Sequence, residues 1–264
     1  MKQIDLYKNL PKKNCGKCRQ KTCMPFALAV IKGDAELSEC PLLDTAEAER
    51  LKGMITVTDW REGLILKLRD EVKKIDLAAI ADLLGGQMKN GSLVIICMGR
   101  PFTISADGEV ATHGHITPWV KILLLHYIRN SFNNSIMIKG MPKQADEKWI
   151  SYAELKSGMV KASSFQREGE DPLKEMLDQN LASVEAILNR LGALKKEGFP
   201  TPYAWALNLL PKVPVLILYW PEENEFPSKV KVLFNPSADK YLDVEAIVFL
   251  IEGLVKNIEA MSRR

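Results

Sequence analysis

Four cysteines near the N-terminus constrain this chain more than any other feature of its sequence. They are Cys15, Cys18, Cys23 and Cys40, with the spacing C-x2-C-x4-C-x16-C. In a cytoplasmic chain disulfides are disfavoured, so cysteines this close together are expected to be metal ligands or redox groups. Structural zinc usually takes two close pairs of ligands, and only one C-x2-C pair is present. Three thiolates from one loop and a fourth from a later return favour an iron–sulfur cluster, with zinc and a thiol redox site as the alternatives.

The residues around these cysteines are typical of a ligand loop followed by a helix. Gly16 lies between the first two cysteines, where a tight loop needs unusual backbone dihedrals. Thr22 is a suitable N-cap and Gly33 a suitable stop, so we predict a helix over Cys23–Lys32. Its apolar side chains would cover one side of a cluster, and they are Phe26, Ala27, Val30 and Ile31.

Basic side chains are concentrated in the same segment. The net charge of the chain is +3, but residues 1–33 contain one acid, Asp5, and eight bases. The bases are Lys2, Lys8, Lys12, Lys13, Lys17, Arg19, Lys21 and Lys32. They would offset the negative charge of a thiolate-ligated cluster and raise its reduction potential, or form an ordinary solvated surface. Because the chain has no long basic run or basic repeat, we predict no nucleic-acid partner.

This segment resembles a known iron–sulfur module. It reads Leu10-Pro-Lys-Lys-Asn-Cys-Gly-Lys-Cys-Arg-Gln-Lys-Thr-Cys-Met-Pro-Phe-Ala and then Lys32-Gly-Asp-Ala-Glu-Leu-Ser-Glu-Cys-Pro. Over about residues 8 to 43 it is similar to the cluster domain of the large subunit of the corrinoid iron–sulfur protein. The same cysteine spacing recurs in the B subunit of the Rnf electron-transport complex. The resemblance implies a [4Fe–4S] cluster that passes low-potential electrons in an anaerobe, and the ligands that it implies are Cys15, Cys18, Cys23 and Cys40.

The rest of the chain is predicted to form a larger domain of the α+β class. A chain of 264 residues accommodates a small module and a second domain, and the expected domains are residues 1–44 and 45–264. Helices are expected over Asp59–Lys74, Asp76–Leu84, Thr117–Arg129, Asp171–Leu191 and Asp243–Ala260. Strands are expected over Ser92–Met98, Pro101–Ser105, Glu109–Thr112, Ala204–Leu210, Val213–Trp220 and Lys229–Phe234. Antiparallel hairpins beside several helices favour α+β over a doubly wound parallel sheet.

The larger domain also resembles a known family, although that family implies no activity. The segments Leu124-Leu-His-Tyr, Lys148-Trp-Ile-Ser-Tyr and Asn224-Glu-Phe-Pro-Ser-Lys are similar to an uncharacterised domain family of anaerobic prokaryotes. Members of that family often follow a cluster module of this kind. The resemblance supports the domain boundary and the anaerobic setting, and it assigns no catalytic residue.

A search of this domain for chemistry gives few candidates. Gly86-Gln-Met-Lys-Asn-Gly91-Ser has the spacing of a P-loop but lacks the lysine before the serine, so we predict a turn before a strand. No motif indicates a dinucleotide, a corrinoid, a haem or a radical-SAM cluster. His113 and His115 would point to one side of an extended segment, so they are either metal, haem or corrinoid ligands or polar side chains of a turn.

The remaining distinctive side chains are expected to have structural roles. His126 is predicted to be a hydrogen-bonded histidine of the core, and Cys97 a buried hydrophobic residue. An acidic loop is expected to be solvated, and it contains Glu222, Glu223 and Glu225. Four tryptophans are expected in the core rather than stacked on a cofactor, and they are Trp119, Trp149, Trp205 and Trp220.

Three functions are compatible with these patterns. The first is electron transfer through the cluster to or from a redox partner protein, such as a corrinoid-dependent or other one-carbon enzyme. The second is an enzyme whose larger domain binds a substrate or tetrapyrrole beside the cluster, and the third is a structural cluster in an interaction module. The sequence does not decide whether the chain is an enzyme. No apolar run approaches the roughly 18 residues of a membrane span and no secretory pattern opens the chain, so we expect a cytoplasmic protein.

Overall fold

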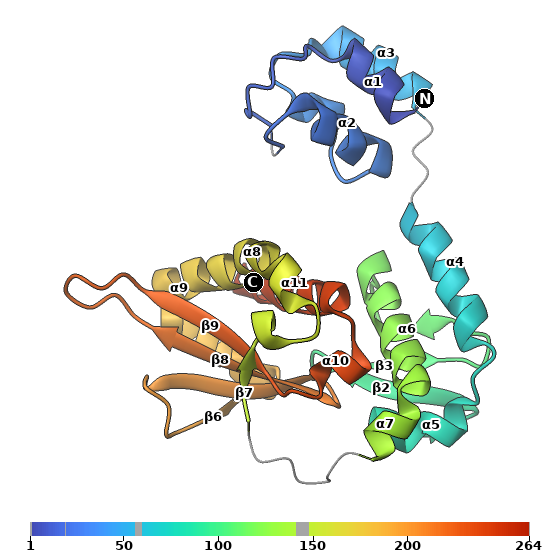
Figure 1. Ribbon diagram of the computed structural model, residues 1–264, viewed down its shortest axis with the longest axis vertical. Coiled ribbons are helices and arrows are strands. Elements are labelled where there is room, and N and C mark those ends of the chain that lie inside the picture. The colour runs from blue at the N-terminus through green and yellow to red at the C-terminus, as the bar shows by residue number, and fades with distance from the viewer. Residues whose placement is uncertain (1, 19, 56–59, 141–147, 264) are drawn as a thin grey trace. The chain divides into compact units, whose positions relative to one another are not determined.

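The computed structural model describes residues 2–18, 20–55, 60–140 and 148–263. Contacts within the chain divide it into two compact units, Met1–Leu64 and Ile65–Arg264, and Figure 1 labels most of their helices and the longer strands. The expected domain boundary between residues 44 and 45 stays a prediction, because compactness does not say which segments fold independently.

The first unit is built from short helices around a small apolar core. Its elements are α1 (Gln3–Asn9), α2 (Cys23–Lys32), the 3-10 turn η1 (Leu37–Glu39) and α3 (Thr45–Met54). The core contains Leu6, Leu10, Phe26, Val30, Leu37 and Leu51. Cys23 and Cys40 belong to the same core, so apolar packing holds two of the four candidate ligands in place.

The helix predicted after the cysteine loop has the expected bounds. α2 ends at Gly33, whose φ of 76° lies in the left-handed region that favours glycine. Thr22 occupies the N-cap position, but its side chain makes no cap hydrogen bond, so the prediction that it caps the helix is wrong. Asn14 satisfies the first turn instead, because its Oδ1 accepts a hydrogen bond from the backbone N–H of Cys23 at 2.9 Å.

The second unit contains two antiparallel sheets, which confirms the expected α+β class. The first sheet has the order β1-β2-β3-β4 and the second the order β5-β9-β8-β7-β6. The strands of the first are β1 (Gln87–Lys89), β2 (Ser92–Cys97), β3 (Arg100–Ile104) and β4 (Val110–Ala111). Those of the second are β5 (Ile150–Ser151), β6 (Leu194–Lys195), β7 (Tyr203–Leu210), β8 (Val213–Trp220) and β9 (Lys229–Phe234). The backbone N–H of Met98 donates to Leu209 O at 2.8 Å and ties the first sheet to β7.

Two hairpin turns shape the first sheet. Asn90-Gly91 joins β1 to β2, and Met98-Gly99 joins β2 to β3. All four residues have positive φ, which is the geometry of type I′ turns. The segment with P-loop spacing therefore contains a short strand, β1, that the sequence did not predict, followed by the predicted turn. A Cβ on Gly86 would lie 2.9 Å from Val94 O, so glycine permits the close approach to β2.

Strand β8 has apolar side chains on both faces because both of its faces are covered. It pairs with β7 on one side and β9 on the other, and nearly all of Val213–Trp220 is buried. Leu216 and Leu218 pack with Ala204 on one face of the sheet. A continuous apolar run therefore marks a central antiparallel strand here, although such runs are more typical of parallel sheets.

Helices complete the second unit, and all five that the sequence predicts are present. The helical elements are α4 (Trp60–Val72), α5 (Leu77–Leu84), α6 (Pro118–Asn133), α7 (Ser135–Lys139), η2 (Tyr152–Glu154), η3 (Gly158–Lys161), α8 (Ala162–Phe165), the π-helix η4 (Gln166–Glu170), α9 (Asp171–Arg190), α10 (Ala238–Tyr241) and α11 (Val244–Ser262). Asp76 caps α5, as predicted for a helix that starts there, and Asp59, the other predicted cap, lies outside the described residues. Asp243 caps α11, a role that was not predicted from the sequence. α11 packs against α6, α9 and η4. In the described ranges no helix is both long and apolar enough to cross a bilayer.

Candidate metal centre

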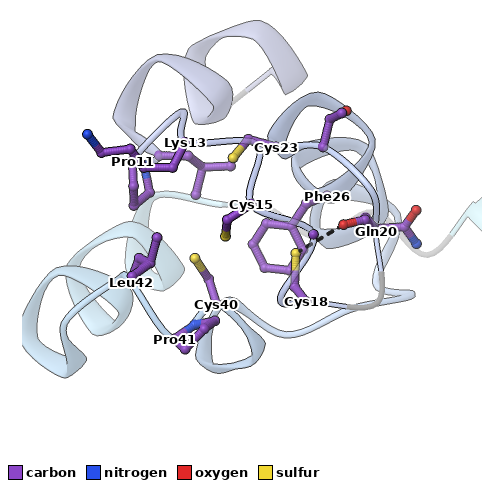
Figure 2. Close-up of a pocket in the computed structure, with 13 residues that line it drawn as sticks. Pro11, Lys13, Cys15, Cys18, Gln20, Cys23, Phe26, Cys40, Pro41 and Leu42 are labelled. Atoms are coloured by element: carbon purple, nitrogen blue, oxygen red, sulfur yellow. Dashed lines mark hydrogen bonds between the residues drawn. The ribbon is translucent and has the colours of Figure 1, made fainter.

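All four cysteines of the N-terminal motif line one cavity of the first unit. Figure 2 shows their side chains arranged around a common space, beside the ring of Phe26. The space among the lining atoms, including its opening to solvent, is about 340 Å³. Apolar residues form much of the remaining wall, and they are Leu10, Pro11, Phe26, Pro41 and Leu42. The fold thus brings together the residues that the sequence selects as ligands.

The four thiols differ in their access to solvent. Cys23 and Cys40 are 8% and 7% exposed and are held by the apolar core, whereas Cys18 is half-buried and Cys15 is exposed. The cavity is therefore apolar on its inner side and reaches the surface at Cys15. A redox group held there would be close to solvent at one corner and shielded at the others.

The loop that carries the first two cysteines has an alternating backbone. φ is positive at Lys12 (56°), Asn14 (48°) and Gly16 (68°) but not at the two residues between them. Alternation of this kind turns successive backbone N–H groups toward one side, where they form a concavity that binds anions such as iron–sulfur clusters. A Cβ at position 16 would meet no close neighbour, so the positive φ, and not a lack of space, explains why this residue is glycine.

Asn14 joins this loop to the helix that carries the third cysteine. Its side chain bonds to the N–H of Cys23, the first residue of α2. Asn14 therefore positions the segment before Cys15 against Cys23, and its left-handed φ is one that asparagine tolerates better than most residues.

The donor set and its geometry fit an iron–sulfur cluster. The four cysteines are free thiols, and Cys18 Sγ donates a weak hydrogen bond to Gln20 O at 3.5 Å. That bond needs the thiol proton, which a metal displaces when sulfur becomes a ligand. Among the described residues no three His, Cys, Asp or Glu side chains are close enough to hold a single metal ion. Ligands of a cubane lie farther apart, because each sulfur binds a different iron.

The histidines belong to no group of three potential metal ligands in the described part of the chain. His113 and His115 are both exposed, and His113 lies in a bend, so their role as ligands or as polar side chains of a turn stays a prediction. His126 is half-buried on α6, with its Nδ1 2.8 Å from Arg129 Nη2 and 3.6 Å from Asp243. Burial lowers the pKa of His126, Arg129 lowers it further, and Asp243 opposes the change. His126 thus has the structural role that was predicted.

The other distinctive side chains are also placed as expected, apart from three of the tryptophans. Cys97 is 2% exposed and burial raises its pKa to about 12, so it is a buried hydrophobic residue. The acidic loop is exposed, and Trp205 is fully buried. The other three tryptophans differ, because they are only half-buried: Trp149 and Trp220 pack against a core cluster, and Trp119 lines a cavity together with Phe249.

Taken together, the cysteine cavity and its loop define a small metal-binding module attached to a larger α+β domain. The chain belongs to the family described as "Domain of unknown function (DUF3786)", whose model matches residues 76–257. Residues 10–42 match the model of a second family, described as "Putative Fe-S cluster". The N-terminal segment is therefore an iron–sulfur module.

Curated relatives match the N-terminal segment. The corrinoid/iron-sulfur protein large subunit of Moorella thermoacetica is 46% identical over 48 residues, which is 18% of this chain and 11% of the relative. The acetyl-CoA decarbonylase/synthase complex subunit gamma of Methanothermobacter thermautotrophicus is 40% identical over 52 residues, or 20% of this chain and 11% of the relative. The chain thus spans about a tenth of the length of these relatives. No solved structure matches the chain.

Proposed function

We propose that Cys15, Cys18, Cys23 and Cys40 ligate a [4Fe–4S] cluster and that the protein transfers low-potential electrons through it. The observation that carries the proposal is the cavity in which all four sulfurs meet, closed by apolar side chains inside and open to the surface at Cys15. Such a cluster, when bound, takes up and releases single electrons at a potential set by charge, hydrogen bonds and exposure. Three thiolates from one loop and a fourth from a later return support a cubane over a single zinc ion, which usually takes two close pairs of ligands.

The residues around the cavity would support electron transfer in distinct ways. Phe26 and Leu10 exclude water from the inner side, which limits loss of iron and sulfide. Cys15 brings one corner of the cavity to the surface, where a partner can approach. Lys13 lines the cavity, and a cation beside an anionic cluster favours its reduced form and so raises the potential.

A corrinoid-dependent protein of one-carbon metabolism is the partner class that we propose. The support is the similarity of residues in the cluster module to a corrinoid/iron-sulfur protein subunit and to subunits of the acetyl-CoA decarbonylase/synthase complex. The basic side chains of the module would favour a partner with an acidic docking surface.

The test is anaerobic purification followed by iron and sulfide analysis and electron paramagnetic resonance of the reduced protein. The expected result is a reducible cluster with equal amounts of iron and sulfide, which then reduces added hydroxocobalamin by one electron per chain. Replacement of Cys15 by serine should abolish this reduction, and Cys97→Ser serves as the matched control. A cluster that resists reduction at accessible potentials would support the structural alternative instead, and zinc in place of iron would overturn the proposal.

A further inference from the structure

The second unit contains a cavity that no predicted motif marks. Its volume is about 300 Å³, at the lower end of the range for sites that bind small organic ligands. Three segments far apart in sequence line it: the β2–β3 turn with the start of β3, the start of α6, and the middle of α11. The lining residues used below are Met98, Arg100, Phe102, Trp119, Phe249, Glu252, Gly253, Lys256 and Asn257.

The turn at the cavity contains a residue whose backbone conformation is unfavourable for its type. Both turns of the first sheet need positive φ at two positions, and the β1–β2 turn meets this need with Asn90-Gly91. The β2–β3 turn has Met98 at the first position, with a φ of 47° that favours asparagine or glycine over methionine. A residue that breaks a local rule in this way indicates that its side chain is needed for something else.

The side chain of Met98 forms part of the cavity wall. It is 7% exposed, and a Cβ on Gly253 of α11 would lie 2.7 Å from Met98 Cε, so a glycine on the helix makes room for it. Met98, Arg100 and Asn257 also line an adjoining hollow, so the cavity continues past the turn.

The walls of the cavity suit a flat aromatic molecule. The rings of Trp119 and Phe249 lie 4.5 Å apart and are tilted by 35°, and Phe102 is buried on another wall. Aromatic rings favour offset or edge contacts with a further ring, and a methionine sulfur adds a favourable contact with the edge of a ring.

The charges of the cavity favour an anion. Two cations line it, Arg100 and Lys256, against one acid, Glu252. Arg100 Nη2 donates to His113 O at 3.0 Å, which fixes the guanidinium and leaves other N–H donors for a ligand. Burial raises the pKa of Glu252 to about 7, and its hydrogen bond with Glu168 adds to the rise. At neutral pH the carboxyl is therefore only partly ionised and offsets only part of the positive charge, including that of Lys256, whose Nζ lies 3.6 Å from it.

We propose that this cavity binds a small aromatic carboxylate. The ring lies against Trp119, Phe249 and Met98, and the carboxylate faces Arg100 and Lys256. The inference concerns a site in the second unit and does not depend on the cluster, so either proposal can fail without the other.

Calorimetry on the full chain can test the proposal with three probes, 2-naphthoate, 2-naphthamide and acetate. The expected result is that 2-naphthoate binds at least tenfold more tightly than the uncharged amide and that acetate does not bind, because ring burial and charge pairing are both required. Equal affinity for acid and amide would overturn the proposal, since the site would then be merely apolar. Absence of 2-naphthoate binding at millimolar concentration would overturn it as well.

Variants locate the site. The double change Arg100→Gln and Lys256→Gln should weaken 2-naphthoate binding at least tenfold and leave 2-naphthamide unchanged, and Trp119→Leu should weaken both. Lys174→Gln is the matched control, because Lys174 also forms an i,i+4 pair with an acid, Asp178, but lies on α9 away from the cavity. Melting curves of each variant check that it is folded. Equal loss of naphthoate binding in the control and the double variant would contradict the site.

Discussion

The cysteine cavity of the first unit and the aromatic cavity of the second differ in how their residues are distributed along the chain. The cysteine cavity is lined by one continuous segment, Leu10–Leu42, whereas the aromatic cavity takes residues from three segments of the second unit. The first depends on a local loop and a short helix, so its ligands can be read from spacing. The second exists only after a hairpin turn and two helices have packed together, so the spacing of its residues in the sequence does not reveal it. Function encoded locally is predictable from a sequence, and function assembled by tertiary packing is not.

The largest expected effect is loss of the cluster when one ligand of the local site is removed. Cys23→Ala should remove or degrade the cluster, because the other three thiolates cannot complete the ligand set. Cys97→Ala is the control, since Cys97 is buried in the second unit and lines the aromatic cavity. Iron and sulfide per chain are the quantities to measure. A Cys97 variant without a cluster would refute the ligand assignment.

Truncation tests whether the two cavities are independent. We expect residues 45–264 to fold without the cluster module, because this segment contains both sheets and their helices. Ala48 and Leu51 of α3 pack in the core of the first unit, so a chain that starts at residue 60, where α4 begins, should be as stable as one that starts at 45. Thermal melting and 2-naphthoate binding of both truncated chains measure this. A truncated chain that remains unfolded would show that the units need each other.

Asn14 shows that even the local site contains a part that spacing does not reveal. Asn14→Ala should destabilise the cluster-loaded first unit by about 2 kcal/mol, since it loses a hydrogen bond and puts alanine at positive φ. Asn14→Gly should cost about 1 kcal/mol, because glycine tolerates the backbone but lacks the acceptor. The rate at which a chelator removes iron from the native protein and from each of the two variants gives the order of their stabilities. An alanine variant as stable as the glycine variant would mean that φ has no role.

The parts of the fold that were predicted from sequence are those with strong local signals. The caps Asp76 and Asp243 and the continuous apolar run of β8 fix their elements without help from distant residues. Two of the missed elements have weak signals: β1 has three exposed residues, and η4 is a π-helix inside a longer helical run. π-Helical turns are rare and arise from tertiary packing, so no sequence pattern predicts them. α3 was also missed, although Asp44 caps it by accepting a local hydrogen bond from the backbone N–H of Glu47.

The same contrast applies to the sites. Gly253 and Met98 are ordinary residues in the sequence, and only the fold shows that a Cβ on Gly253 would lie 2.7 Å from Met98 Cε and that Met98 has a positive φ. Asn14 could have been noticed, because asparagine before a glycine-containing loop is a common choice for a left-handed residue. Its bond to Cys23 could not, since it depends on how the loop returns to α2.

The next-largest expected effect is a change of about 1 kcal/mol in the free energy of unfolding with pH, and it comes from Glu252 of the aromatic cavity. Its pKa is about 7 in the folded protein against 4.5 for an unperturbed glutamate. Between these values folding takes up a proton, so this group makes the protein less stable as pH rises from about 4.5 to 7. The full shift corresponds to about 3 kcal/mol, and partial exposure of the carboxyl reduces this to about 1 kcal/mol.

Glu252→Gln should remove that part of the pH dependence and stabilise the protein at pH 8. The charged groups involved are Glu168 on η4 and Lys256 on α11, with Arg167 and Lys161 acting on Glu168. Urea unfolding at pH 5 and pH 8 measures the difference, and Glu259→Gln on the exposed side of the same helix is the control. If the free energy of unfolding of the Glu252 variant changes between pH 5 and pH 8 as much as that of the native protein, the carboxyl is ionised in the folded protein.

The smallest expected effect lies at the surface of the cluster module. Reversal of Lys12, Lys17 and Lys21 to glutamate should slow reduction of the cluster by an acidic partner several-fold and weaken the salt dependence of that rate. These side chains are exposed, and charges at the surface are screened over about 8 Å at physiological ionic strength. Arg19 lies outside the described residues and is left unchanged. Lys13→Glu should instead lower the midpoint potential, because Lys13 lines the cavity, and should leave the rate with a neutral reductant unchanged. If both variants keep the native potential and the native partner kinetics, the basic segment is an ordinary solvated surface, and the local site ends at its cysteines.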